Sequence, residues 1–325
     1  MNENLAGRRI ASDMPLVSIV IPVYNGVNYM REAIDSALAQ TYPNIEILVI
    51  NDGSTDDTEQ VALSYGNRIR YFSQKNGGQS AALNRGIDEM KGEYFSWLSH
   101  DDRFHPTFIS QIMASAEADR WSESVFYFSD YEYINDSGKI LSEVSNADIT
   151  PEAFVFKLLY SNTVNGCSVV APRSKLLECG KFNTARPHTS DVELFIKLGV
   201  ICKAKRINAV LVQSRTHALQ ATKRRYKYHM SETSIFASDI ICYLQQEVVY
   251  ASAAACGELR PYRSLGIKWS SNGYLDAGIV ALHCDRVLSN TFWLRWWYLM
   301  KCVFLYAAKM LRRKIIGIAK SVISR

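Results

Sequence analysis

The stretch Leu16-Val-Ser-Ile-Val-Ile-Pro-Val23 is an almost continuous apolar run. Such a run is typical of a strand that is buried on both faces of a parallel sheet. After Tyr24-Asn25-Gly26 the apolar residues change to helical spacing, with Met30 and Ile34 on one side, and the pattern ends before Pro43. A buried strand followed directly by an amphipathic helix predicts an α/β sheet.

The same alternation continues to about residue 102 and then becomes less regular. Strands separated by helices of this length favour a parallel sheet. The further strands that we expect are Ile45–Ile50, Arg68–Phe72, Tyr94–Leu98, Val125–Ser129, Ser168–Ala171 and Ile207–Gln213. The further helices are one after the polar turn at 51–57, then Gln79–Met90, Asp191–Leu198 and Tyr226–Ala255, with Arg260–Ser271 as a connecting stretch.

The composition excludes some classes of protein. Of the 325 residues, 48% are hydrophobic and 21% are charged, which rules out a wholly disordered chain. The net charge of +5 is uneven, because residues 291–325 carry eight basic side chains and no acidic one. The first 290 residues therefore hold 29 basic side chains against 32 acidic ones, a net charge of −3. This balance argues against nucleic acid as a partner.

The cysteines and the N-terminus indicate the compartment. The seven cysteines are an odd number and show no C-x-x-C spacing, which favours unpaired thiols in a reducing compartment over a disulfide framework or a zinc site. No apolar stretch of signal-peptide length follows Arg8 and Arg9. We therefore expect the bulk of the chain to be cytoplasmic.

Polar residues follow three of the expected strands. They are Tyr24-Asn25, Asp52-Gly53-Ser54 and Asp101-Asp102. Ligands of open α/β sheets bind outside the carboxyl ends of the strands, so these groups are expected to lie together. They offer an aromatic face, a hydrogen-bond acceptor and a carboxylate pair for a hard cation, which suits a nucleotide.

Each motif alone also has a purely structural interpretation. Asp52-Gly53-Ser54 could be a turn into a helix that Ser54 and Asp57 cap. Asp101-Asp102 could be a solvated acidic loop, and Asn76-Gly77-Gly78 a flexible turn. Their joint order favours the functional interpretation.

Five stretches in this order resemble the motifs of family-2 glycosyltransferases of the bacterial surface-polysaccharide type. They are Val17–Asn25, Ile47–Asp56, Asn76–Gly86, Gly92–Asp102 and Asp191–Leu198. The resemblance covers about residues 16–215 and is specific because the motifs occur together. It implies the GT-A fold, a mostly parallel sheet flanked by helices, followed by a helical C-terminal region. The implied domains are a tail at 1–14, a catalytic domain at 15–220, a helical extension at 221–290 and a basic amphipathic helix at 291–325.

The resemblance also implies a nucleoside-diphosphate sugar donor, with UDP the commonest carrier. Tyr24 would lie against the base, and Asp52 would accept a hydrogen bond from its edge. The full set expected to contact the nucleotide is Pro22, Tyr24, Asn25, Asp52, Gly78, Asn84, Asp101 and His217. The basic run Lys223-Arg224-Arg225 would either close over the diphosphate or be a solvated charge run.

A divalent metal, Mg²⁺ or Mn²⁺, follows from the same resemblance. Asp101 and Asp102 match the end of the family's DxD-type motif, whose usual first acidic residue is Ser99 here. Asp102 is therefore expected to bind the metal, with Asp101 nearer the ribose. His217 is expected to touch the metal or the diphosphate, or else to be structural.

An inverting hexosyl transfer needs a base for the acceptor hydroxyl. The resemblance gives this role to Asp191, where the acidic residue that usually precedes it is Ser190, and Glu193 is the alternative base. Asp191 could instead only favour a helix N-terminus. Arg186 and His188 precede it and are candidates to meet the acceptor.

The basic tail suggests a location for the enzyme. On a helical wheel its lysines and arginines fall within one arc opposite aromatic and aliphatic residues, as in a helix that lies in a membrane interface. Packing on the catalytic domain or in an oligomer interface is the alternative. We therefore expect a peripheral enzyme on the inner face of the cytoplasmic membrane, with a lipid-linked glycan as acceptor. A nucleotidyltransferase and a catalytically inactive membrane-associated binding protein remain as alternative functions.

Overall fold

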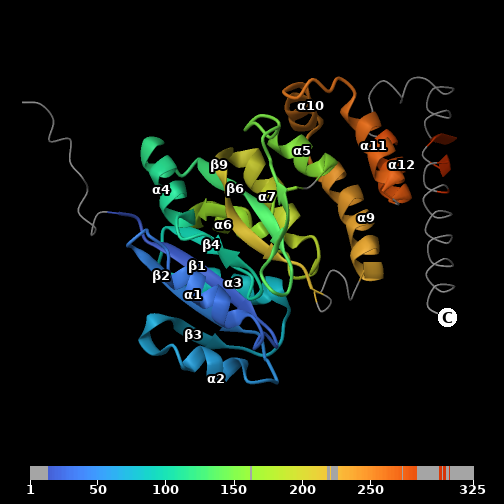
Figure 1. Ribbon diagram of the computed structural model, residues 1–325. Helices are drawn as coiled ribbons and strands as arrows, with labels where there is room; N and C mark the ends of the chain where they lie inside the picture. The colour runs from blue at the N-terminus through green and yellow to red at the C-terminus, as the bar shows by residue number, and fades with distance from the viewer. Residues whose placement is uncertain are drawn as a thin grey trace, which may run out of the picture. The chain divides into compact units, whose positions relative to one another are not determined.

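The computed structural model describes residues 14–161, 163–217, 220, 226–272, 274–283, 300, 301, 303, 304 and 307 (Figure 1). The chain divides into two compact units. The first contains Met1–Pro151 and Thr163–His217, and the second contains Glu152–Asn162 and Ala218–Arg325. Each unit is considered by itself.

The first unit is built on one mixed sheet. Its described strands pair in the order β3-β2-β1-β4-β8-β6-β9-β5, and β7 pairs with β6. The strands are β1 Val17–Val23, β2 Ile45–Asn51, β3 Arg70–Ser73, β4 Tyr94–Trp97, β5 Arg103–Phe104, β6 Val125–Ile134, β7 Ile140–Val144, β8 Val169–Pro172 and β9 Lys203–Arg215. The helices are α1 Met30–Leu38, α2 Thr58–Leu63, α3 Gln79–Glu89, α4 Phe108–Ala118, α6 Arg173–Glu178 and α7 Ser190–Ile201, with short 3₁₀ turns at Gly66–Arg68 and Gly166–Ser168.

The strand directions bring distant parts of the chain to one edge of the sheet. The pairs β3–β2, β2–β1 and β1–β4 are parallel, as the alternation predicts. The next two pairs, β4–β8 and β8–β6, are antiparallel, so β6 runs in the same direction as β4. β9 is parallel to β6. The carboxyl ends of β1, β2, β4, β6 and β9 therefore share one edge.

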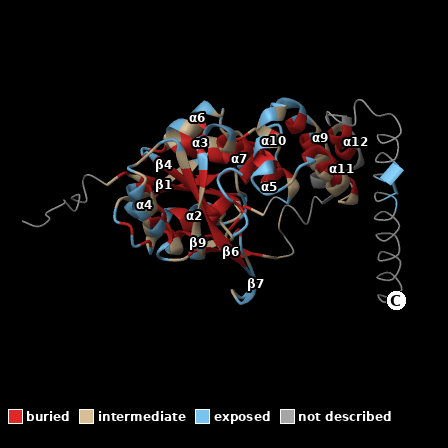
Figure 2. Cartoon of the chain, turned by 90° about the horizontal axis from the view of Figure 1, so that it is seen from above, coloured by how far each residue is buried: buried red, intermediate tan, exposed pale blue. Residues whose placement is uncertain are grey.

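The core of this unit lies on both sides of β1. Every residue of Val17–Val23 is buried, which confirms the interpretation of the opening run (Figure 2). Helix α3 approaches β1 very closely, because a Cβ at Gly86 would lie 2.3 Å from Val20 Cγ1. Glycine is therefore required at this helix–sheet contact.

Some elements differ from the expectations. Helix α4 was not predicted, although Phe108, Ile112 and Ala116 form its buried face. β9 is longer than predicted at both ends because its partner β6 runs alongside it from Val125 to Ile134. The antiparallel pairing of β8 could not be seen in the local sequence pattern.

The second unit is helical where it is described. It contains α5 Phe154–Tyr160, α9 Tyr226–Tyr243, α10 Gln246–Ala254, α11 Pro261–Ser271 and α12 Leu275–His283. The expectation of a connecting stretch at Arg260–Ser271 is wrong, because Pro261 begins a helix that buries Tyr262, Leu265 and Trp269 on one face. Trp269 Nε1 donates to Leu159 O at 2.9 Å, so α11 is attached to α5.

Within the described ranges, no helix combines the length and apolar character needed to cross a membrane. The five cysteines described there, Cys167, Cys179, Cys202, Cys242 and Cys256, are free thiols. Of the predicted basic helix at 291–325, only residues 300, 301, 303, 304 and 307 belong to the described part.

Candidate active site

Asp52, which follows β2, organises the loop between β3 and α3. This carboxylate is almost fully buried and accepts hydrogen bonds from Gln74 Nε2 at 2.8 Å, Gly77 N at 2.9 Å and Gly78 N at 2.7 Å. Gly78 has a φ of +87° and directly precedes α3. Three donors thus hold this loop against Asp52 and occupy three of the roughly four acceptor positions of its carboxylate.

The loop after β1 is fixed by side chains of the neighbouring turn. Asn25 lies in the left-handed region with a φ of +49°. Its Oδ1 accepts from Thr55 N at 2.8 Å, and its own N donates to Ser54 Oγ at 2.9 Å. Pro22 is buried in β1, whereas Tyr24 is 48% exposed. Tyr24 therefore has a side chain that is open to a ligand.

The predicted helix cap is made by a different residue. Ser54 and Asp57 do not cap α2, and Asp57 makes no side-chain cap hydrogen bond. Asp56 takes this place, since its Oδ1 accepts from Thr58 N at 3.1 Å and its Oδ2 accepts from Val27 N at 3.4 Å. The carboxylate thus joins the two loops that follow β1 and β2.

The turn after β4 carries the two adjacent carboxylates. Asp101 Oδ2 lies 2.9 Å from His217 Nε2, and the side chains are 14% and 10% exposed. Burial would raise the pKa of the Asp101 carboxyl, but the hydrogen bond with His217 and the nearby His100 outweigh it, so this pKa lies below its ordinary value.

Asp102 faces the interior of the same turn. Its Oδ1 accepts from Arg215 N at 2.7 Å, and the Cys167 thiol lies 3.4 Å from its Oδ2. Burial, followed by the charge of Asp101, raises the pKa of the Asp102 carboxyl well above its ordinary value. The two carboxylates are therefore in different environments.

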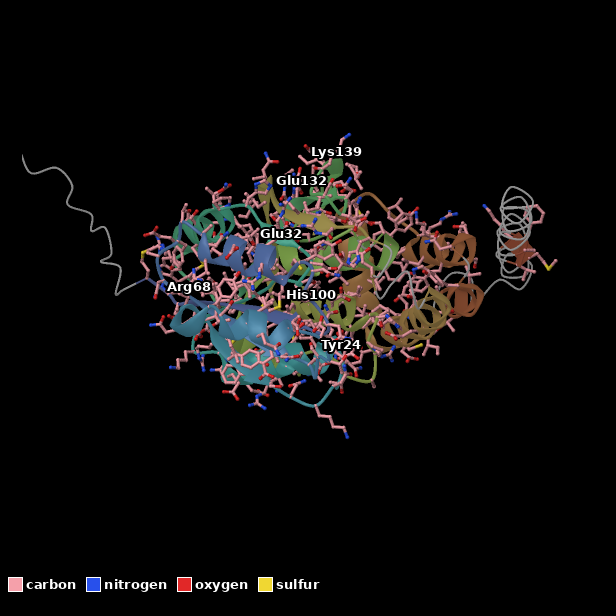
Figure 3. All side chains as sticks on the ribbon, turned by 60° about the horizontal axis from the view of Figure 1, so that its bottom comes forward. Tyr24, Glu32, Arg68, His100, Glu132 and Lys139 are labelled. Carbon is pink, nitrogen blue, oxygen red and sulfur yellow. The ribbon has the colours of Figure 1, made fainter. Side chains whose placement is uncertain are left out.

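The ends of β1 and β4 are in contact at this edge. Figure 3 labels Tyr24, which follows β1, and His100, which follows β4. Gly26 lies against the His100 ring, because a Cβ there would be 2.5 Å from His100 Cδ2. His100, which was not predicted as a site residue, directly precedes Asp101, and the pairing of β1 with β4 brings it against Gly26.

Asn84 of α3 has a structural contact. Its Nδ2 donates to Phe182 O at 2.8 Å, and its Oδ1 accepts from Phe182 N at 2.9 Å. A second contact joins the first residues of two helices, since Ser80 Oγ lies 2.8 Å from Ser190 Oγ. The start of α7, which carries Asp191, is therefore attached to the helix that begins at the Gly78 loop.

The two candidate bases in the first turn of α7 differ in their contacts. Glu193 is buried and is bound by Lys197 Nζ at 2.7 Å, Arg186 Nε at 3.3 Å and Asn183 Nδ2 at 3.1 Å. Asp191 is half-buried, and its Oδ1 accepts from Val192 N at 2.9 Å. Two cations and an amide thus hold the Glu193 carboxylate against the loop before α7.

The donor atoms at this edge fit a divalent cation that also binds a ligand. Asp101 and His217 provide an oxygen and a nitrogen 2.9 Å apart. In the part of the chain that the structure describes, no group of three or more His, Cys, Asp or Glu side chains could hold a metal without other ligands. Mg²⁺ and Mn²⁺ commonly bind through few protein ligands and complete their shell with phosphate oxygens and water. The predicted cations Lys223-Arg224-Arg225 lie outside the described residues.

Comparison with known proteins identifies relatives of this chain. Residues 18–154 match the model described as glycosyl transferase family 2. An uncharacterized glycosyltransferase of Rickettsia felis is 44% identical over 242 residues, which are 72% of this chain and 39% of the relative. The chain spans at most 39% of the length of the first three relatives. A shorter one, from Rickettsia typhi, is 39% identical over 82% of this chain and 84% of its own length.

More distant similarities agree with these relatives. Chondroitin synthase of Pasteurella multocida is 32% identical over 207 residues, which are 63% of this chain and 21% of that protein. Among solved structures, residues 1–349 of TarS from S. aureus in complex with UDP-GlcNAc align with a TM-score of 0.63 at 15% identity, covering 89% of each chain. This likeness confirms the GT-A-type fold. By the length and identity of its match to the Rickettsia typhi relative, the chain belongs to glycosyltransferase family 2.

Proposed function

We propose that the protein transfers a sugar from a nucleoside-diphosphate sugar to an acceptor hydroxyl, with a divalent cation and with inversion at the anomeric carbon. One observation carries the proposal. The Asp101–His217 pair lies at the edge of the sheet where the carboxyl ends of the parallel strands meet. The Ser80–Ser190 contact attaches the start of α7, which carries Asp191, to the start of α3, beside the loop that Asp52 binds. The proposed cation ligands thus follow β4 and β9, and the proposed base lies in a helix attached to the start of α3.

The nucleotide would bind across the loops after β1 and β2. Tyr24 has the exposed ring on which a base can lie. Asp52 uses three of its acceptor positions for the Gly77-Gly78 loop, and the remaining one is available to an N–H of the base. The donor would be a UDP-sugar, which agrees with the UDP-GlcNAc named for the TarS structure.

Asp101 and His217 would hold the cation, Mg²⁺ or Mn²⁺, together with the diphosphate. In this proposal Asp101 takes the metal-binding role that the family motif suggests for Asp102, because Asp102 is more deeply buried and accepts from Arg215 N. A bound cation would supply positive charge that offsets the charge developing on the departing diphosphate. Asp102 would instead fix the shape of the turn.

Asp191 would act as the general base. Its carboxylate takes the proton of the acceptor hydroxyl while the acceptor oxygen forms a bond to the anomeric carbon from the face opposite the leaving group. The bond between that carbon and the diphosphate oxygen breaks, and the nucleoside diphosphate leaves with the electron pair. Glu193 supports the loop before α7 through Arg186 and Asn183.

The acceptor would be a lipid-linked glycan on the cytoplasmic face of a membrane. Two observations support this part. Chondroitin synthase and hyaluronan synthase of Pasteurella multocida, which by their names make polysaccharides, are relatives. Within the basic segment 291–325, Met300 is 50% exposed and Phe304 is 72% exposed, as expected for a surface that meets lipid.

Nucleotide binding tests the donor part of the proposal. UDP, GDP and TDP sugars are added to the full chain with and without Mn²⁺, and the melting temperature is recorded. We expect stabilisation by at least one of them that requires the cation. Absence of any stabilisation would contradict the proposal, and release of diphosphate from a nucleoside triphosphate would favour the nucleotidyltransferase instead.

Asp191→Asn tests the chemical step. The variant is expected to bind the nucleotide-sugar as the wild type does but to lose turnover by about 10²–10⁴-fold, the usual contribution of a general base. Glu193→Gln is the matched control and should keep most of the turnover. Sugar transfer or donor hydrolysis is followed by release of nucleoside diphosphate. Equal turnover of Asp191→Asn and wild type would contradict the assignment of Asp191 as the general base. Cation-dependent binding of the nucleotide-sugar with no turnover in the wild type would identify a binding protein.

A further inference from the structure

Arg215 is the largest fully buried side chain of the described residues, at 1% exposure. It is the last residue of β9, and the sequence analysis did not select it. A guanidinium ion removed from water costs several kcal/mol, in order of magnitude, unless its charge and donors are satisfied. The fold must therefore supply partners for it, and these partners show what the residue holds together.

Two of these contacts reach the turn after β4. The backbone N of Arg215 donates to Asp102 Oδ1 at 2.7 Å. Its Nε donates to the backbone O of Asp101 at 3.0 Å. Both acidic residues of the turn are thus held by one residue of β9, one through its carboxylate and the other through its carbonyl.

The remaining donors reach two other segments. Nη1 donates to Asn135 O at 3.1 Å and Asp136 O at 2.8 Å, in the turn after β6. Nη2 binds Glu32 Oε2 at 2.7 Å, and this carboxylate, which Figure 3 labels, comes from α1. Since Glu32 Oε2 also accepts from Arg103 Nη1 at 3.1 Å, the residue that follows Asp102 is joined to the same group.

A ring connects Arg215 to His217. The guanidinium carbon lies 4.5 Å from the centroid of Tyr29, and the Tyr29 ring lies 5.2 Å from that of His217. Tyr29 is itself fixed because its hydroxyl donates to Asp136 Oδ1 at 2.8 Å. Arg215 therefore contacts the main chain of Asp101 on one side and, through Tyr29, supports its partner His217 on the other.

We propose that Arg215 is a positioning residue that keeps the Asp101 carboxylate and the His217 imidazole at the separation needed for a divalent cation and a diphosphate. The inference rests on the proposed function. Partners of metal ligands commonly change metal affinity by about 10–100-fold when they are replaced. The planar fork of arginine is needed, because lysine at this position keeps the charge but cannot reach three segments at once.

The same two strands contain a matched control. Arg206 of β9 binds Asp130 of β6 through Nε and Nη2, and the two side chains are 16% and 6% exposed. Its other acceptors are Ser145 Oγ and Asn208 Oδ1, which do not belong to the turn after β4. Arg206→Lys thus disturbs an ion pair of the same kind without touching the site.

The test compares Arg215→Lys with Arg206→Lys in the full chain. UDP binding is titrated with and without Mn²⁺, and hydrogen exchange is measured over residues 99–104. We expect Arg215→Lys to weaken Mn²⁺-dependent UDP binding by about 10-fold or more and to speed exchange at the turn, with no such change in Arg206→Lys. Mn²⁺-dependent binding by Arg215→Lys within about twofold of wild type would overturn the inference, since that is well below the effect such partners have.

A second variant covers the case in which Arg215→Lys does not fold. Glu32→Gln removes the charge of the half-exposed partner, so it should change both readouts in the same direction but less. An unchanged Glu32→Gln would then count against the inference. If wild-type protein binds no nucleotide with any cation, the proposed function fails. In that event equal exchange at residues 99–104 in Arg215→Lys and wild type shows separately that Arg215 does not hold the turn.

Discussion

The loop after β2 and the turn after β4 occupy similar positions in the sheet but have different contacts. Each follows a buried parallel strand, and each contains a buried aspartate. Asp52 in the first has both oxygens on donors of the loop between β3 and α3, two of them backbone N–H groups. Asp101 in the second has an oxygen 2.9 Å from a side chain that is distant in sequence, His217.

The position of a carboxylate after a strand therefore does not by itself determine its hydrogen-bond partners. A glycine-rich segment such as Gly77-Gly78 brings free backbone N–H groups close, and they occupy the carboxylate. The turn after β4 has its backbone N–H groups directed elsewhere, as Asp102 N donates to Ser99 O. Its carboxylates are instead bound by Arg215 N and the His217 side chain, and in the proposed function the Asp101–His217 pair holds the cation.

Asp101→Asn is the variant with the largest expected effect, and it tests whether the turn after β4 binds the cation. If this turn binds the cation, the variant should lose cation-dependent UDP binding by at least about 100-fold, which is the upper end of what loss of a ligand's partner costs. The residual binding should no longer depend on Mn²⁺. Isothermal titration with and without Mn²⁺ checks this, and circular dichroism verifies that the variant is folded. Unchanged Mn²⁺ dependence would show that the two regions are alike in function.

Asp52→Ala addresses the other region. Three donors lose their acceptor, so the free energy of unfolding should fall by about 1–3 kcal/mol. UDP binding should weaken by the same factor with and without Mn²⁺, because the loop rather than the cation is affected. Urea denaturation and the two titrations measure this. A selective loss of the Mn²⁺-dependent part would place Asp52 with the cation and contradict the distinction between the regions.

The smallest effect concerns Asn25 in the loop after β1. Its φ of +49° is unfavourable for most residues, so Asn25→Ala should be less stable than Asn25→Gly by about 1 kcal/mol. Both variants lose the contact with Thr55 N, so their difference isolates the backbone conformation. Thermal unfolding measures it. Equal stabilities would mean that this loop is not fixed in the left-handed region.

Much of the first half of the fold could be predicted. The apolar runs of β1, β2 and β4 and the helical spacing of α1 and α3 are local patterns, and the elements occur as expected. Helix α11 was missed because Arg260–Ser271 has many polar residues, although its buried Tyr262, Leu265 and Trp269 have helical spacing. Asp56 was missed as the acceptor of Thr58 N because the pattern favoured Ser54 and Asp57 as the cap pair.

For the candidate site, the sequence alone determined the residue types and the family to which they belong. The carboxylates, the tyrosine and the glycines follow recognisable strands, since side-chain alternation and apolar runs are properties of neighbouring residues. It also determined that the basic charge is concentrated in residues 291–325.

The tertiary structure determines which of these groups lie close together. Two antiparallel steps, from β4 through β8 to β6, return β6 and β9 to the direction of β1, and this brings Arg215 and His217 beside Asp101. It also gives Asp191 and Glu193 different surroundings, because the Glu193 carboxylate is bound by Lys197, Arg186 and Asn183. The physical reason is that strand order and long-range ion pairing depend on the packing of the whole sheet, which no local pattern of residues encodes.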